Sequence, residues 1–276
     1  MLAIRKTFRP AVPAAAGLIF FLNAACVFAA FDQASYAHKE EFSKTLPLAA
    51  DGSFSLKNTN GIVRVSTWDK PEVEIKAEKS ASRESVLAEV KIEVSADPGS
   101  VVVDTIYPRR PFLRAKVVYD VRVPAGVRIE SVRTTNGNVE LTGRFAGVKA
   151  GTTNGTVRLD KVDGELDVST TNGSIRAQDV VGRVKARTTN GGITLGLGGV
   201  KDEIEASTTN GSITLRVQGA FNADLTARTT NGRVNTDFPI TVQGTVGSRR
   251  RLEGRIGEGG PKIDLRTTNG SIHITK

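Results

Sequence analysis

The fold is decided by the stretch from Leu166 to Ala177, which reads Leu-Asp-Val-Ser-Thr-Thr-Asn-Gly-Ser-Ile-Arg-Ala. Its apolar residues Leu166, Val168, Ile175 and Ala177 alternate with polar residues on both sides of an Asn-Gly pair. Because alternate residues of a strand point to opposite faces, this pattern predicts two short strands that bury one face. We expect Asn-Gly to supply the positive backbone φ that a tight turn between them demands.

The tetrapeptide Thr-Thr-Asn-Gly at the centre of this stretch occurs seven times. The first five intervals between successive copies are 18, 18, 18, 20 and 21 residues, and the last is 38 residues. Equal spacing of one turn signal indicates that a small β unit is copied and stacked. The predicted turn residues are Asn136, Gly137, Asn154, Gly155, Asn172, Gly173, Asn190, Gly191, Asn210, Gly211, Asn231, Gly232, Asn269 and Gly270.

Two architectures satisfy this pattern. Asn-Gly between alternating strands is a strong hairpin signal, which would give an antiparallel meander. In a solenoid, each repeat instead makes one coil and equivalent residues stack in columns. Alternating charge favours the solenoid, since neighbours in a column avoid like charges. One outward column runs Lys149, Asp167, Lys185, Glu205, and the next runs Arg133, Gly151, Ser169, Arg187, Ser207, Arg228, with no two arginines in adjacent copies. We therefore predict an all-β, right-handed β-solenoid.

The N-terminus predicts export. Residues 1–29 carry three basic residues, an apolar run and small residues up to Ala29, which is typical of a secretory signal peptide cut after that residue. Cys26 is the only cysteine, so the mature chain would hold neither disulfides nor thiolate metal sites. The segment before Cys26 also leaves a lipid anchor open. No other apolar run is long enough to cross a bilayer.

The mature chain divides by composition. Trp68 and all three tyrosines precede residue 120, in a part with alternating segments at 61–66, 72–77, 90–94, 101–106 and 115–123 and a short helix expected at 80–88. We predict an irregular N-terminal β region and cap over residues 30–126 and the repeat solenoid over 127–276. Asn58 to Ile62 looks like a degenerate first copy. The stretch 236–262 interrupts the period and is expected to form a second cap.

Several segments together carry a family resemblance: Asn58 to Val65 with Trp68-Asp69, Val121 to Val127, the Thr-Thr-Asn-Gly array, and Leu252 to Gly257. With these segments the chain resembles the bacterial putative-adhesin family, long catalogued as a domain of unknown function and related to auto-transporter adhesin head domains. The resemblance covers nearly all of the mature chain. It implies a β-solenoid-like fold at the cell envelope, with no established functional residues to transfer.

The sequence offers little catalytic chemistry. His38 and His273 lie far apart without a ligand pattern, no nucleophile elbow or phosphate loop is present, and the turn residue is Asn rather than the Asp of calcium-binding β-rolls. We expect no enzyme, cofactor or metal site. The alternative is a β-helix enzyme acting on polysaccharide, with Asp167 and Glu205 two coils apart. Ice binding by threonine ranks is disfavoured, because adjacent threonines point to opposite faces.

The basic surface suggests a partner. Without the three positive charges of the predicted signal, the formal charge of +9 becomes 9 − 3 = +6. Outside the cytoplasm this charge suits an anionic envelope polymer, a glycan or a surface protein rather than nucleic acid. We predict a non-enzymatic adhesin or envelope-binding module in the periplasm, at the cell surface or secreted. Its candidate ligand-binding residues are Arg133, Lys149, Arg158, Arg176, Lys185, Arg187 and Arg228.

Overall fold

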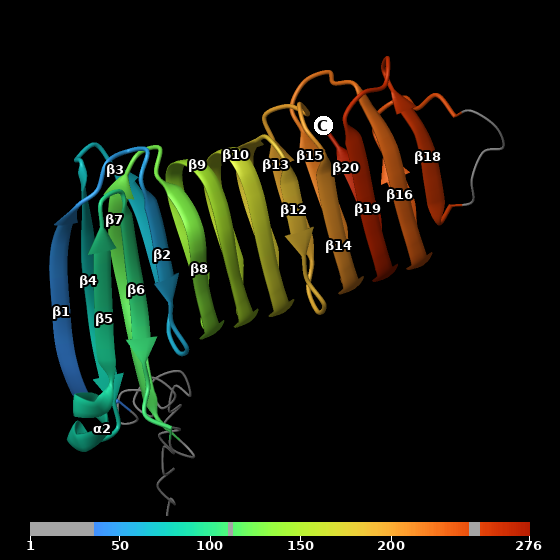
Figure 1. Ribbon diagram of the computed structural model, residues 1–276. Helices are drawn as coiled ribbons and strands as arrows, with labels where there is room; N and C mark the ends of the chain where they lie inside the picture. Colours follow the sequence, from blue (N-terminus) through green and yellow to red (C-terminus); the bar gives the residue numbers. More distant parts are fainter. Residues whose placement is uncertain (1–35, 110–112, 243–248) are drawn as a thin grey trace, which may run out of the picture.

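The computed structural model describes residues 36–109, 113–242 and 249–276 (Figure 1). These residues form strands β1 to β20 and one short helix, α2 at Glu84–Glu89. All of these strands belong to one hydrogen-bonded sheet, which coils into a long rack with two broad faces. The predicted signal peptide and Cys26 lie outside the described residues. The division at residue 126 stays a prediction.

Each repeat contributes one coil to the rack. The strand before Asn-Gly lies on one side, here called the Thr-strand face, and the strand after it lies on the other, the return face. The Thr-strand face holds β8 (Arg128–Asn136), the second halves of β9 (Val139–Asn154) and β10 (Val157–Asn172), β12 (Val184–Arg187), β14 (Ile204–Asn210), β16 (Ala223–Asn231) and β19 (Lys262–Asn269). The return face holds the first halves of β9 and β10, β11 (Ile175–Val181), β13 (Ile193–Leu197), β15 (Ile213–Val217), β17 (Val234–Thr236) and β20 (Ile272–Thr275).

The register between coils is set by the repeat. Asn154 lies beside Asn172, and Val157 lies beside Ile175, in parallel pairs. A meander would join the copies antiparallel, so the solenoid prediction is confirmed. Asp167 lies between Lys149 and Lys185 in the column expected for it.

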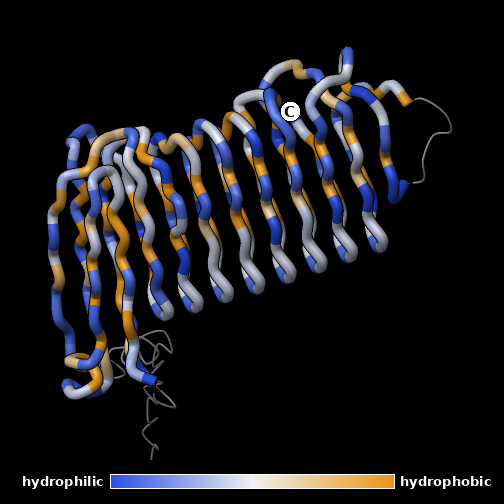
Figure 2. Tube along the Cα trace, in the orientation of Figure 1, coloured by the Kyte–Doolittle hydropathy of each residue, from blue (hydrophilic) through white to orange (hydrophobic). Residues whose placement is uncertain are grey.

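The core lies between the two faces. Leu166, Val168, Ile175 and Ala177 are all 0% exposed, as the alternation predicts. Hydrophobic and hydrophilic residues alternate along the strands in Figure 2, and the same alternation recurs from coil to coil. Each coil therefore closes its apolar interior only against the coils beside it, so stability depends on the stack rather than on any single copy.

The N-terminal part extends both faces. On the Thr-strand side, β8 is followed by β2 (Ser53–Lys57), β6 (Ser100–Ile106) and β5 (Lys91–Asp97). On the return side, β9 is followed by β3 (Val63–Trp68), β7 (Ala115–Pro124), β4 (Glu72–Ala81) and β1 (His38–Pro47). Asn60 bridges to Asn136, so the degenerate copy forms the first coil of the array. The helix expected at 80–88 begins later, because Ser80 and Ala81 still pair with β7.

The seventh copy is out of order. Strand β19 pairs with both β14 and β16, so this copy lies between the fifth and the sixth (Figure 1). Arg266 is therefore the neighbour of Arg228, which on its other side faces Arg251. The prediction that no two arginines are adjacent is wrong, because it assumed that copies stack in sequence order.

A glycine-rich crossing makes this insertion feasible. After β16 the chain returns along the outer edge as β18 (Arg251–Ile256), antiparallel to β16, which covers that edge as a cap should. Residues 257–261 then pass over the start of β16, where the Glu258 N–H donates to Asn222 Oδ1 at 3.1 Å. Gly257 and Gly259 adopt φ of 59° and 81°, which other residues rarely adopt.

Candidate binding surface

A ladder of asparagines runs along the corner where the two faces meet, here called the Asn edge. Each Nδ2 donates to the Oδ1 of the asparagine in the preceding coil, at 2.7 or 2.8 Å. In stacking order the ladder comprises Asn60, Asn136, Asn154, Asn172, Asn190, Asn210, Asn269 and Asn231. Seven intervals of about 4.8 Å make it roughly 34 Å long. Each amide has a second N–H, which the ladder does not use.

The two threonines of each copy have different roles. The first is buried, and its hydroxyl donates to the glycine carbonyl of the neighbouring coil at 2.8–3.2 Å. The second is exposed in every copy, as at Thr171 and Thr189. Adjacent threonines do point to opposite sides, as expected. The first threonine therefore stabilises the stack, while the second faces outward.

The glycine after each asparagine is required by close packing. A Cβ on Gly191 would lie 1.9 Å from the Gly173 carbonyl oxygen, and one on Gly173 would lie 1.8 Å from that of Gly155. The φ of Gly191 is 157°, close to extended, and among the described residues other than glycine only Lys161 and Asp179 have positive φ. The expected reason for Asn-Gly, a positive φ, is thus wrong. The contact between coils, not the turn, excludes a side chain.

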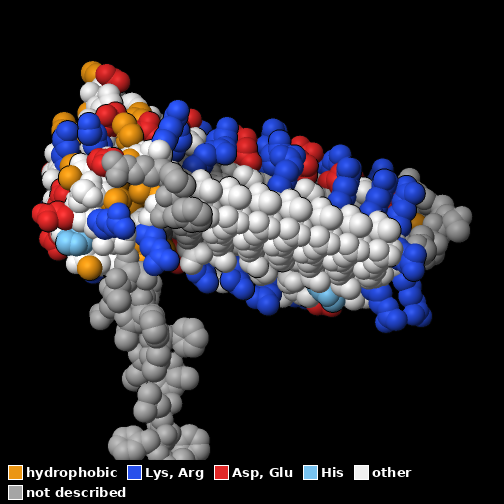
Figure 3. All heavy atoms as spheres, turned by 90° about the horizontal axis from the view of Figure 1, so that it is seen from below, with side chains coloured by type: hydrophobic (Ala, Val, Ile, Leu, Met, Phe, Trp, Pro, Cys, Tyr) orange, Lys and Arg blue, Asp and Glu red, His pale blue; other side chains and the backbone are white. Residues whose placement is uncertain are grey.

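The surface along this edge is a neutral strip between two basic rims. Figure 3 looks onto it and shows a band of uncharged polar atoms with Lys and Arg side chains along both sides. The rim on the Thr-strand face lies three residues before the asparagines and includes Lys57, Arg133, Arg187, Arg266 and Arg228. The rim on the return face lies four residues after them and includes Arg64, Arg158 and Arg176.

The structure divides the predicted ligand-binding residues between these faces. Arg133, Lys149, Lys185, Arg187 and Arg228 lie on the Thr-strand face, whereas Arg158 and Arg176 lie on the return face. They do not form one patch. Instead, they lie on either side of the Asn edge.

Internal carboxylates pair with three of the seven. Glu140 pairs with Arg158 at 3.1 Å, Glu205 pairs with Arg187 at 2.7 Å, and Glu253 pairs with Arg228. The remaining four have no ion-pair partner among the described residues: Arg133, Lys149, Arg176 and Lys185. These four are the cations with most capacity for an external anion.

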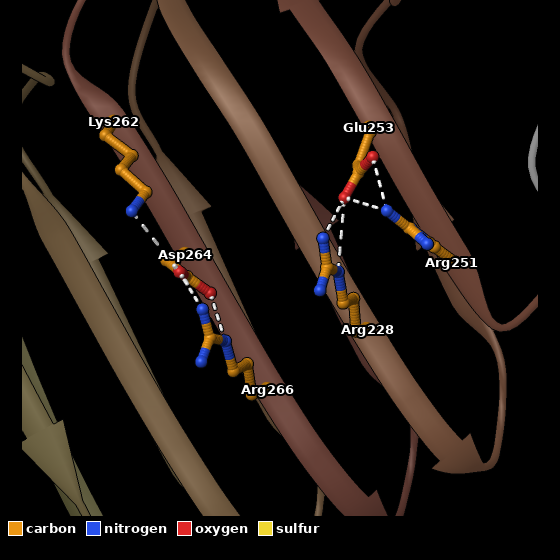
Figure 4. Close-up of polar contacts among 6 residues, drawn as sticks. All are labelled: Arg228, Arg251, Glu253, Lys262, Asp264 and Arg266. Atoms are coloured by element: carbon orange, nitrogen blue, oxygen red, sulfur yellow. Dashed lines mark hydrogen bonds and ion pairs between the residues drawn. The ribbon is translucent and has the colours of Figure 1, made fainter.

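At the C-terminal end, carboxylates hold the neighbouring arginines together (Figure 4). Glu253 accepts hydrogen bonds from Arg228 and from Arg251 on the next strand, and these bonds lower its pKa. Asp264 accepts two bonds from Arg266, at 2.6 and 2.8 Å, and these raise the pKa of the guanidinium. Each adjacent cation therefore has an anion beside it, which offsets the like-charge contacts that insertion creates.

Two buried tyrosines fix the first coil at the other end of the ladder. Tyr107 donates its hydroxyl to Asn58 Oδ1 at 2.8 Å, and the Tyr119 hydroxyl lies 2.6 Å from that of Thr105. Burial raises the pKa of Tyr119 to about 12, so its proton stays in place at neutral pH. The aromatic residues in the N-terminal part thus anchor the start of the array.

The alternative catalytic pair is separated by a cation. Lys185 lies directly beside Asp167 on one coil and Glu205 on the next. A cation between two carboxylates favours their ionised forms, which opposes the raised pKa that a general acid needs. In the ranges 36–109, 113–242 and 249–276, no group of three or more His, Cys, Asp or Glu could hold a metal ion. Nor does any helix in this part of the chain have the length and hydropathy to span a membrane.

Sequence reasoning missed Glu140 and Arg64, which continue the return-face rim. Arg64 lies 3.4 Å from Asp120 and 3.4 Å from Glu140. A signal was present, because Glu140, Arg158 and Arg176 are spaced at intervals of 18 residues, the period of the array.

Parallel coils stacked in register define a β-solenoid repeat protein. The family model described as Toastrack DUF4097 matches residues 23–275, and the chain belongs to this family. This confirms the resemblance to a family of putative adhesins whose function is not established. A search of curated proteins found no match.

Solved structures with a similar fold come from several bacteria. A putative cell adhesion protein from Clostridium sporogenes ATCC 15579 is 12% identical, with 86% of this chain and 99% of that chain covered and a TM-score of 0.39. A putative adhesin from Bacteroides fragilis NCTC 9343 is 12% identical, with 86% and 96% covered and a TM-score of 0.45. A putative lipid binding protein from Parabacteroides distasonis ATCC 8503 is 11% identical, with 86% and 97% covered and a TM-score of 0.26.

Proposed function

We propose that this protein is an exported, non-enzymatic binding module that holds a linear anionic envelope polymer along the Asn edge. The observation that carries the proposal is the neutral strip of threonines and asparagines between two rows of cations (Figure 3). A chain lying on the strip would meet hydroxyl and amide groups about every 4.8 Å, and its anionic groups would reach a rim on either side.

Three further points support this reading. The outer threonines and the second amide N–H groups are exposed, so contacts with a ligand would not require the stack to open. The unpaired cations Arg133 and Lys149 lie on the Thr-strand face, and Arg176 lies on the other. The N-terminal sequence is typical of a secretory signal, which fits an adhesin or envelope scaffold in the periplasm, at the cell surface or outside the cell.

Binding to immobilised polymers tests the proposal. The purified protein would be titrated against polygalacturonate, dextran sulfate, lipoteichoic acid, anionic phospholipid vesicles and neutral dextran. We expect saturable binding to at least one anionic polymer, weaker at high salt, and none to dextran. Arg133→Gln/Arg187→Gln should weaken it. Arg183→Gln/Lys201→Gln removes the same charge at the opposite edge and should leave it unchanged.

The other outcomes would overturn specific parts. Binding to none of the anionic polymers, or equal loss in both double variants, would refute binding along the Asn edge. Binding only to vesicles would replace the polymer with a lipid surface. Release of new reducing ends from any glycan would show an enzyme. A mature N-terminus other than Ala30, or retention in the cytoplasm, would refute the predicted export.

A further inference from the structure

Two arginines on the return face are direct neighbours. Arg158 of β10 lies opposite Arg176 of β11 in the parallel ladder. Like charges opposite each other on adjacent strands destabilise a sheet. Beyond Arg176 the column continues with Thr194, which brings no charge.

The carboxylates of this column are already used on its other side. Arg64 lies between Asp120 and Glu140, and Glu140 also pairs with Arg158 at 3.1 Å. Arg176 has no ion-pair partner in the described part of the chain. The alternation of charge that begins at Asp120 therefore ends with one cation that lacks an anion.

The protein itself shows how such a pair is bridged. Arg228 and Arg251 are also opposite each other on adjacent strands, and the single carboxylate of Glu253 accepts hydrogen bonds from both (Figure 4). A carboxylate matches the planar fork of a guanidinium, and such charge-assisted bonds are among the strongest in proteins. The pair on the return face has the same arrangement without the bridging group.

A groove beside this pair leaves space for a ligand. It has a volume of about 450 Å³ and is lined by Glu140, Leu141, Thr142, Arg158, Leu159, Asp160, Arg176 and Gln178. Gln178 and Thr142 offer neutral hydrogen-bonding groups two residues further along their strands. Asp160 lies directly beside Gln178 and would repel an anion at that end, so the anionic group belongs at the arginine end.

We propose that Arg158 and Arg176 bind one carboxylate of a linear acidic polysaccharide, in the position that Glu253 occupies between Arg228 and Arg251. The sugar ring that carries this carboxylate lies in the groove, with its hydroxyls toward Gln178 and Thr142. This inference rests on the proposed function and deepens it, because it names the anionic group and places it on the return-face rim. The chain continues from there along the neutral strip.

Affinity for polygalacturonate tests the inference at fixed salt. Arg176→Gln should weaken binding by at least about tenfold, the loss expected for one charge-assisted contact. Arg176→Lys should recover only part of it, because an ammonium lacks the fork. Arg216→Gln removes an exposed cation on the same face, two coils away, and should change affinity by less than about twofold. Asp160→Asn should tighten binding.

Two controls separate this inference from its basis. Polygalacturonate with its carboxyl groups reduced should lose the difference between wild type and Arg176→Gln. Without polymer, Arg176→Gln should melt no lower than wild type, since the change removes a like-charge contact. If wild type binds the acidic polymer but Arg176→Gln matches Arg216→Gln, the arginine pair is not the site, although the proposed function stands. If wild type binds no acidic polymer, both fail.

Discussion

Replacement of Gly191 by alanine tests whether contact between coils, rather than turn conformation, requires the glycine column. The added Cβ would lie 1.9 Å from the Gly173 carbonyl oxygen and 2.5 Å from its carbon. Protein Cβ atoms essentially never come within 3.0 Å of such an atom, so the two coils must separate by at least 3.0 − 1.9 = 1.1 Å. Both atoms belong to backbone, and neither can rotate away.

The hydrogen bonds at this contact set the magnitude. Gly173 N–H donates to Asn190 O at 2.9 Å, Thr188 Oγ1 donates to Gly173 O at 2.9 Å, and Asn190 Nδ2 donates to Asn172 Oδ1 at 2.8 Å. A shift of 1.1 Å would stretch all three beyond bonding distance. At about 1 kcal/mol each, the variant should lose about 3 kcal/mol of stability. For a chain of this size that is a fall of roughly 6–12 °C in melting temperature.

A matched control lies in the same coil. A Cβ on Gly196 would meet its nearest atom at 3.6 Å, and its φ lies outside the left-handed region. Gly196→Ala should therefore be neutral, or more stable by up to about 1 kcal/mol through the unfolded chain. Urea titration followed by far-ultraviolet circular dichroism would compare the two variants. Equal midpoints would refute the close-packing argument and restore the turn as the reason for glycine.

Three further predictions follow from the same geometry. Thr188→Val should cost about 1–2 kcal/mol in urea titration, because it leaves a carbonyl without its partner, whereas Thr189→Val at the exposed position should cost almost nothing. Asp167→Lys should lower the melting temperature at low salt and less so at high salt, because it places three lysines in one column; equal shifts at both salts would contradict the stacking of these charges. Glu253→Gln should destabilise at neutral pH only. Its arginine partners lower the pKa of the carboxylate, so their contribution is lost as the pH falls through that lowered value, and the two melting curves should converge in acid.

The regular part of the array could be predicted from sequence because one period fixes both fold and register. The spacing of 18 residues places Asn154 beside Asn172, and alternation about this point decides which side chains are buried. A shift of one residue would turn Val168 outward and Asp167 inward, so only one register buries the aliphatic residues. Local chemistry and the stack agree here, and the prediction needed no knowledge of distant contacts.

The C-terminal order could not be predicted in the same way. Each copy carries the same edge pattern, so the seventh copy fits the fifth as well as the sixth does. Asn269 accepts from Asn231 and donates to Asn210 with the geometry of every other step. Local pattern thus leaves the order of the last two copies open. The crossing by residues 257–261 and the carboxylates beside Arg228 and Arg266 decide it, and these act between parts distant in sequence.

The candidate surface was predictable only as a set of residue types. The charged positions were recognised, but pairing depends on the side-chain positions of neighbouring coils. Glu140 pairs with Arg158 rather than Arg176, although the three are equally spaced in the sequence. Which cation is left without an anion is therefore a property of the assembled column. This is why the arginine pair on the return face emerges from the structure and not from the list of basic residues.

The outer threonine offers a final argument about where function resides on this rack. The stack explains the inner threonine, the asparagine and the glycine of each copy, since each makes a contact with the neighbouring coil. The second threonine, as at Thr171, is exposed and donates to none of those contacts. A preference for β structure alone would admit Val, Ile or Tyr in some copies, yet threonine occupies all seven. A residue repeated beyond what packing requires indicates selection on the surface itself, and this row borders the strip on which we place the polymer.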